Sequence, residues 1–229
     1  MKNTGKPSSR DSSFESLISL CHEVGRLYEP GLVFIGGIGV YLHAVNHADV
    51  KELAEATKDA DLYISVAGFS DMRDIEELTA NNRLSKHEFK KAGFSFDVYT
   101  ERQSKLPVPY ANVSAMAHVY DGVRVASPEH LLVLKLDAAV DRKDSEHGRK
   151  DIKDIIRILM VADSIQSFDV EAACAFMRDE HLAMLEEIVK GPEFLAISLG
   201  NAKMAKALRS RFNAVFDAIR KQYLGDGAG

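Results

Sequence analysis

The sequence predicts an α/β protein with a mixed sheet and flanking helices over 13–126, followed by an all-helical part over 127–224. Three observations support this division. Short apolar runs and alternation with a period of two are confined to the first part. A helix start with an N-cap serine and a proline stands at 127–129. Beyond it, apolar residues recur at intervals of three and four. Residues 1–12 are polar and are expected to form a disordered tail.

The first part contains signals for both helices and strands. Pro30-Gly31 ends an initial amphipathic helix, and Gly36-Gly37 follows an apolar run directly. Asp-Gly at 121–122, between β-forming residues, is a hairpin signal. The expected elements are helices over 14–28, 38–45, 49–57 and 70–82, strands over 32–35 and 59–66, a hairpin over 84–100, a loop over 106–110 and a second hairpin over 119–125.

The second part shows only helical periodicity. Gly191-Pro192 separates two of its helices. The expected helices cover 128–142, 148–162, 169–178, 181–189 and 202–223.

Composition excludes several classes of protein. Of 229 residues, 29 are Lys or Arg and 34 are Asp or Glu, which gives a net charge of −5 and argues against a protein that mainly coats nucleic acid. Two cysteines, Cys21 and Cys174, cannot form a disulfide framework or a four-cysteine zinc site. Reduced thiols predict a cytoplasmic location. No apolar run reaches the roughly 18 residues of a membrane-spanning helix, so no membrane partner is expected.

Three features of the first part point to phosphate and metal chemistry. Gly36-Gly37 stands where a strand turns into a helix, and free backbone N–H groups there can hold a phosphate. Asp59 and Asp61 share the polar face of an alternating strand, and paired carboxylates suit Mg²⁺. Asp97 lies on the polar face of a later strand. If the two strands are neighbours, Asp97 completes a site for two metal ions.

Each feature also has a simpler interpretation. A glycine pair is often only a tight turn, and an Asp-x-Asp pair is often only the solvated face of a strand. An acid such as Asp97 is often a surface residue. The order of the features along the chain favours the functional interpretation over these alternatives.

The same segments resemble a known superfamily. The stretches FIGGIGVYLHAV, TKDADLYIS and FSFDVYT are similar to the glycine, paired-acid and single-acid motifs of DNA polymerase beta-type nucleotidyltransferases. The segment 127–159 resembles the part that follows the core in AbiEii-like nucleotidyltransferase toxins. Its matching residues are Lys135, Arg142, Lys150, Asp151 and Asp154. The resemblance covers about residues 32–160.

Two positions depart from the family pattern. The family often has an arginine two residues before Thr57, where this chain has Glu55, and a hydroxyl-bearing residue after the glycines, where this chain has Ile38. The first departure weakens assignment to one subfamily. The second leaves phosphate binding to the backbone.

The resemblance implies a nucleotidyltransferase-type sheet and a Mg²⁺-dependent enzyme with two ions. Asp59, Asp61 and Asp97 would be catalytic and metal-binding residues, and Gly36, Gly37 and Lys135 would bind the nucleotide. The implied partners are an NTP, an RNA (tRNA) or protein acceptor, and an antitoxin protein. The active site is expected between the two parts of the chain.

Two other functions compete with this one. The first is a non-catalytic nucleotide-binding or protein-interaction module on the same fold, which dispersed acids or a salt bridge to one of them would favour. The second is a dinucleotide-binding enzyme that uses Gly37-Ile38-Gly39, but Leu42 stands where that fingerprint needs a third glycine.

Overall fold

The computed structural model describes residues 9–75, 77–81, 86–102 and 105–225. Its strands form one seven-stranded mixed sheet in the order β3-β4-β5-β2-β1-β7-β6. β2 pairs with β5, and β1 with β7, in parallel, and the other pairs are antiparallel. The strands are β1 (Leu32–Ile35), β2 (Asp59–Ile64), β3 (Thr79–Asn81), β4 (Lys86–Lys91), β5 (Phe94–Thr100), β6 (His118–Tyr120) and β7 (Val123–Val125).

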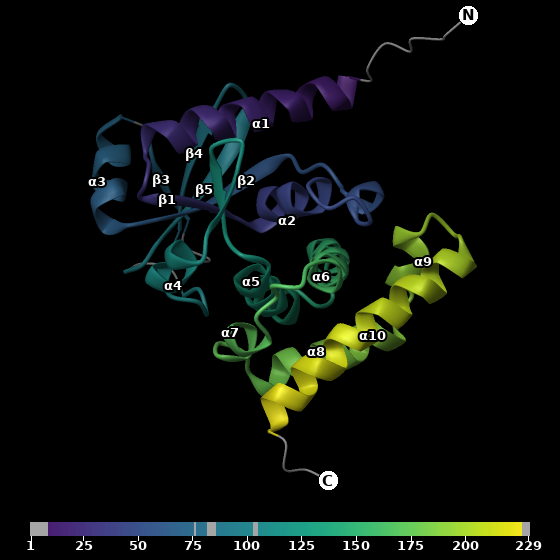
Figure 1. Cartoon of the computed structure of the whole chain (residues 1–229). Helices are drawn as coiled ribbons and strands as arrows, with labels where there is room; N and C mark the ends of the chain where they lie inside the picture. Colours follow the sequence, from purple (N-terminus) through teal and green to yellow (C-terminus); the bar gives the residue numbers. More distant parts are fainter. Residues whose placement is uncertain (1–8, 76, 82–85, 103–104, 226–229) are drawn as a thin grey trace, which may run out of the picture.

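Helices surround this sheet and make up the whole second part of the chain (Figure 1). They are α1 (Ser9–Leu27), α2 (Gly36–Val45), α3 (Val66–Ile75), α4 (Tyr110–Ala115), α5 (Pro128–Asp141), α6 (Glu146–Ser164), α7 (Val170–Cys174), α8 (Asp179–Lys190), α9 (Glu193–Ile197) and α10 (Ala202–Leu224), with a 3-10 turn at Lys51–Leu53. The predicted α/β class with a helical second part is confirmed. In the part of the chain that the structure describes, no helix is long and apolar enough to cross a membrane.

Several expected boundaries are wrong. α1 begins at Ser9, so residues 9–12 belong to a helix and not to the tail. The helix expected over 70–82 is α3, which ends at Ile75, and Thr79–Asn81 of the expected helix form the strand β3 instead. α3 begins directly after β2 at Val66. The reason is local, because Ser65 Oγ accepts a hydrogen bond from the Gly68 N–H at 3.1 Å and caps the helix there. Residues 82–85 lie outside the described residues.

Three further differences concern short elements. Only a 3-10 turn forms within the helix expected over 49–57. The short helices α4 and α9 were not predicted, because each is too brief to show a helical period.

The alternation along the strands sends side chains to two separate cores. On one face, Leu62 and Phe96 pack beneath α1 with Leu17 and Cys21. On the other face, Tyr63 belongs to a larger cluster that includes residues of α5, α6 and α10. The polar positions of β2 and β5 therefore face the helical part of the chain.

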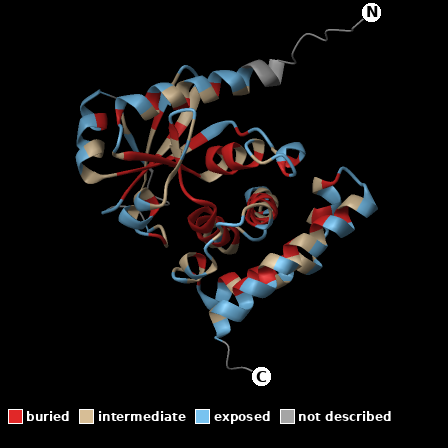
Figure 2. Ribbon diagram, in the orientation of Figure 1, coloured by how far each residue is buried: buried red, intermediate tan, exposed pale blue. Residues whose placement is uncertain are grey.

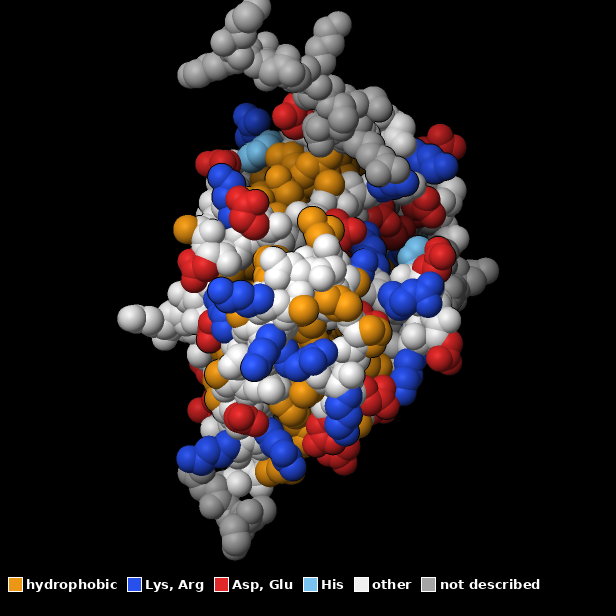
Figure 3. Space-filling model, turned by 90° about the vertical axis from the view of Figure 1, so that its right-hand side faces the viewer, with side chains coloured by type: hydrophobic (Ala, Val, Ile, Leu, Met, Phe, Trp, Pro, Cys, Tyr) orange, Lys and Arg blue, Asp and Glu red, His pale blue; other side chains and the backbone are white. Residues whose placement is uncertain are grey.

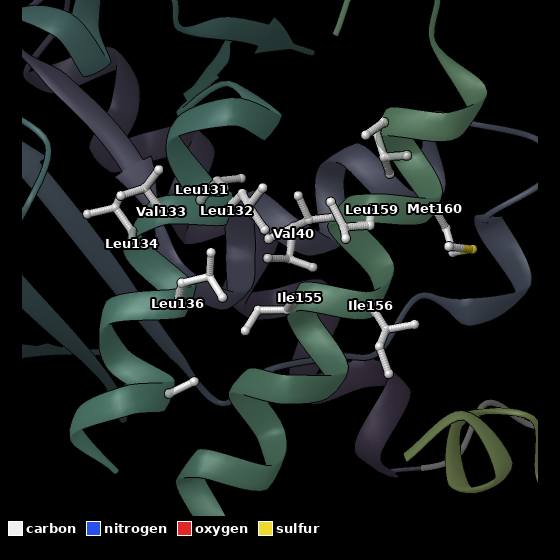
Figure 4. Packing of buried hydrophobic residues seen from close by; sticks show 14 of the residues in the cluster. Val40, Leu131, Leu132, Val133, Leu134, Leu136, Ile155, Ile156, Leu159 and Met160 are labelled. Atoms are coloured by element: carbon white, nitrogen blue, oxygen red, sulfur yellow. The ribbon is translucent and has the colours of Figure 1, made fainter. Parts of the chain in front are cut away.

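The larger core joins both parts of the chain. Figure 4 shows Val40 of α2 among Leu131 and Leu132 of α5 and Ile155 and Leu159 of α6. In Figure 2 these helices and the central strands are the most extensively buried elements. The residues from 127 onward thus pack on the sheet part and share its core.

The surface carries charges of both signs. On the face in Figure 3, Lys and Arg side chains are interspersed with Asp and Glu. This mixture agrees with the small net charge of −5.

Candidate active site

The sheet brings the predicted carboxylates together on neighbouring strands. β2 and β5 pair in parallel, with Asp61 directly opposite Asp97 and Asp59 opposite Ser95. Residues that oppose each other across a strand pair point to the same face of the sheet. Asp59, Asp61 and Asp97 therefore project from one face, and all three line the same cavity.

This cavity has a volume of about 680 Å³ and lies between the two parts of the chain. The sheet part contributes Gly36, Gly37, the three aspartates, Lys86 and Tyr99. The helical part contributes Lys135, Asp137, Arg142, His147, Lys150, Asp151 and Arg178. Cations and carboxylates thus face each other across a space of the size that small-molecule sites have.

The N-terminus of α2 borders the cavity beside Asp61. Gly36 has a φ of +64°, a conformation that favours glycine, and a Cβ at this position would overlap the Asp61 carboxylate. No side chain caps this helix, because its N-cap residue is Ile35. The first N–H groups of α2 are therefore directed toward a site that can hold an anion.

Asp61 is the aspartate with the most unfavourable environment for a negative charge. Burial is the main cause that raises the pKa of Asp61 to about 6. Lys135 opposes this shift, while the charges of Asp59 and Asp97 add to it. Burial therefore outweighs the nearby Lys135 charge and disfavours the ionised form of Asp61.

Asp59 is better compensated than Asp61. Thr57 Oγ1 donates a hydrogen bond of 2.7 Å to Asp59 Oδ1, and Lys150 Nζ donates one of 3.1 Å to Thr57 Oγ1. Burial alone would raise the pKa of Asp59, but the hydrogen bond from Thr57 and the charge of Lys150 lower it overall. Asp59 is therefore ionised at neutral pH.

Asp97 forms an ion pair that sequence reasoning missed. Lys86 Nζ contacts Asp97 Oδ2, and their side chains are only 11% and 17% exposed. Burial raises the pKa of Asp97, and Lys86 opposes the shift. The alternation of β4 could have placed Lys86 on this face, but only the register, which sets Glu88 opposite Asp97, brings the Lys86 ammonium within reach of that carboxylate.

The three aspartates do not form the most compact group of metal-type ligands. Within the described residues, the group whose ligand atoms all lie within 4.8 Å of one another is Asp137, Glu180 and His181. Arg178 Nη2 pairs with both Asp137 and Glu180, and the Arg178 N–H donates to His181 Nδ1 at 3.3 Å. A guanidinium thus supplies the positive charge in that group.

Lys135 lines the cavity but belongs to a buried ionic network. Its ammonium lies 3.0 Å from Asp151 Oδ1 and 2.7 Å from Asp154 Oδ2, with 10% of the side chain exposed. Arg142 pairs with Asp151 at 2.7 Å, and Arg157 with Asp154 at 2.9 Å. Burial alone would lower the pKa of Lys135, but Asp154 and Asp151 raise it above its ordinary value. Any nucleotide that binds Lys135 shares it with two carboxylates.

The network also explains the unusual acid before β2. Arg157 Nη2 pairs with Glu55, and Arg157 Nε donates to the Leu53 carbonyl at 2.6 Å. The resembled family often has an arginine at position 55. In this chain that position is the acid Glu55, and the arginine beside it is Arg157 of α6.

We expect Lys135→Ala to lower the free energy of unfolding by about 3 kcal/mol or more, because it leaves two buried carboxylates without their shared cation. Chemical denaturation measures this. The matched control is Lys143→Ala, which breaks an ion pair with Glu187 whose side chains are each 52% exposed and should cost less than about 1 kcal/mol. Equal losses in the two variants would contradict the structural role of Lys135.

Comparison with solved structures identifies the fold. JHP933 from Helicobacter pylori aligns with a TM-score of 0.52 at 15% identity, over 95% of this chain and 96% of that chain. A second H. pylori structure, described as a nucleotidyltransferase, aligns with a TM-score of 0.52 at 13% identity, over 94% and 98%. An antigenic nucleotidyltransferase-like protein from Paracoccidioides brasiliensis aligns with a TM-score of 0.50 at 15% identity, over 86% and 93%.

No protein-family model matches the chain, and no curated protein matches it in sequence. The structural likenesses cover nearly the whole chain, including the helical part. The chain therefore has a nucleotidyltransferase-like fold, as the resemblance of its motifs implied. At these identities the likeness concerns the fold, and the chemistry must be argued from the cavity.

Proposed function

We propose that the protein is a Mg²⁺-dependent nucleotidyltransferase that moves a nucleoside monophosphate from an NTP to a hydroxyl of RNA, such as tRNA, or of a protein. One observation carries this proposal. Asp59, Asp61 and Asp97 project from neighbouring strands into one cavity, beside the uncapped N-terminus of α2. Carboxylates for metal ions and N–H groups for phosphates thus line the same space.

The residues present fit Mg²⁺. The donors are hard carboxylate oxygens, and burial, to which the charges of Asp59 and Asp97 add, raises the pKa of Asp61. A divalent cation beside Asp61 would favour its ionised form. Asp59 and Asp61 would hold one ion against the triphosphate, and Asp97 would complete the ligands of a second ion. When bound, such ions neutralise phosphate charge and stabilise the attacking and leaving oxygens.

The chain itself would bind and orient the reactants. The N–H groups at Gly36 and Gly37 would hold the phosphates, with Lys135 contributing charge from the opposite wall. Asp97 would position the attacking hydroxyl and accept its proton. A bond then forms between the acceptor oxygen and the α-phosphorus, and the bond to the departing pyrophosphate breaks.

The helical part supports a finer assignment to AbiEii-like toxins. Lys135, Arg142, Asp151 and Asp154, which match the family pattern, form one ionic network at the cavity in this chain. On this assignment the cytoplasmic protein would be a component of a toxin–antitoxin or phage-defence system, and its activity would be held in check by an antitoxin protein.

The direct test is incubation with each labelled NTP, Mg²⁺ and either total tRNA or cell lysate, followed by a search for labelled RNA or protein. We expect one NTP to label one class of acceptor. The double variant Asp59→Asn/Asp61→Asn is the control and should give no label. Equal labelling by this variant would show that the aspartates are not the catalytic site.

The ion pair between Lys86 and Asp97 favours a second candidate, a non-catalytic nucleotide-binding module. This candidate predicts NTP binding in a calorimeter without any labelled product. Turnover by the wild-type protein would exclude it.

A further inference from the structure

A row of carboxylates crosses three neighbouring strands of the sheet. Glu88 of β4 lies opposite Asp97 of β5, which lies opposite Asp61 of β2. Like charges that oppose each other across strands destabilise the pairing. Only part of this charge is dispersed, because Ser95 Oγ donates to Glu88 Oε1 at 3.1 Å. The row therefore needs a cation.

Lys86 provides that cation from the same face of the sheet. It stands two residues before Glu88 on β4, and its ammonium reaches Asp97 Oδ2 while lying 5.6 Å from the centre of the Tyr99 ring. Lys135 does not compete for Asp97, because Asp151 and Asp154 hold its ammonium. The neutralisation of Asp97 is thus assigned to Lys86, a residue in none of the predicted motifs.

A metal ion at Asp97 would compete with this contact for the carboxylate. A Mg²⁺ ion binds carboxylate oxygens at about 2.1 Å and would lie next to the ammonium group. The three aspartates also do not offer ligand atoms that all lie within 4.8 Å of one another. Bringing them together around a metal ion would move the Asp97 carboxylate, which Lys86 holds at Oδ2.

We propose that Lys86 is a built-in counter-ion that a divalent cation must displace from Asp97, so that Lys86 sets the metal affinity of this position. Without metal, the ion pair offsets the repulsion among the carboxylates of this row and so stabilises the strand pairing. With metal and NTP, the ammonium leaves Asp97 and the carboxylate becomes a ligand. This inference rests on the proposed function, which it deepens by naming the group that regulates metal loading.

The first test measures Mn²⁺ binding by electron paramagnetic resonance of the free ion, with a non-hydrolysable NTP analogue present. Of the two proposed ions, we consider the one that is held more weakly. Lys86→Met should bind this Mn²⁺ ion about tenfold more tightly than the wild type does, because an opposing charge has been removed. Lys90→Met is the matched control. Lys90 shares the strand and the face but lies opposite Ser95, so its removal should leave affinity unchanged.

The second test uses the wild-type protein and does not depend on the folding of a variant. Acetylation of lysines by a limiting reagent is followed by mass spectrometry with and without Mn²⁺ and the NTP analogue. Labelling of Lys86 should rise severalfold when metal binds, because its ammonium has lost its buried partner. Labelling of Lys90 is the internal reference and should stay constant.

The outcomes separate this inference from the proposed function. If the wild type binds no Mn²⁺ with or without the analogue, both are overturned. If it binds Mn²⁺ while Lys86→Met and Lys90→Met match it in affinity, or while Lys86 labelling does not rise, Lys86 is only a structural ion pair. Tighter binding in Lys86→Met together with metal-dependent labelling of Lys86 supports the exchange.

Discussion

Asp61→Asn is expected to reduce nucleotidyl transfer by more than tenfold while leaving the fold intact. Asp61 projects into the cavity opposite Asp97 and beside the N-terminus of α2, so it is central to the proposed metal site. An amide has nearly the same shape but loses the charge that binds Mg²⁺. Transfer of labelled nucleotide and Mn²⁺ binding measure the loss. Unchanged transfer would remove Asp61 from the catalytic site.

The same variant should stabilise the metal-free protein at neutral pH. The folded-state pKa of Asp61 is about 6, above its ordinary value of 3.8, so ionisation disfavours the folded state. Well below pH 3.8 the carboxyl is protonated in both states and the cost is absent. It grows as pH rises through 6 and then stays constant.

Denaturation at several pH values tests this expectation. The stability of Asp61→Asn relative to the wild type should rise between pH 4 and pH 7 and then level off, by an amount on the order of 2 kcal/mol. A stability difference between Asp61→Asn and the wild type that does not change with pH would show that ionisation of Asp61 does not destabilise the folded state.

Gly36→Ala is expected to have the second large effect, with loss of transfer by more than tenfold and a clear loss of stability. The new methyl group would overlap the Asp61 carboxylate, and the φ of +64° is unfavourable for alanine. Relief of the overlap must move either the Asp61 side chain or the start of α2. Both movements disrupt the place where phosphate and metal would meet.

Gly93→Ala is the matched control for this variant. Gly93 also has a positive φ, +86°, but nothing lies within 4 Å of the position that a Cβ would take. It therefore shares the backbone cost of about 1–2 kcal/mol without the overlap. We expect normal transfer from Gly93→Ala. If both variants lose stability and activity equally, the proximity of Gly36 to Asp61 has no functional meaning.

Local patterns determined the fold class and the polar faces of the strands. Alternation with a period of two placed Asp59 and Asp61 on one face, and the helix start predicted at Ser127 is where α5 begins, after the last strand. These features depend on neighbours within a few residues, which the sequence displays directly. The side-chain cap at Ser65 depends on equally close neighbours, but the strand expected over 59–66 extends past it.

Only the tertiary structure decided which charges meet. The register of β4 with β5 sets Glu88 opposite Asp97 and so brings Lys86, two residues earlier on the same face, within reach of Asp97. The packing of α6 brings Arg157 to Glu55, a residue 102 positions away. The packing of α6 also buries Lys135 between Asp151 and Asp154. The sequence shows no periodic pattern that identifies the partner of a charged residue. The partner depends on which elements pack together and in which register. The sequence by itself therefore determined where the acids stand, and the fold determined what neutralises them.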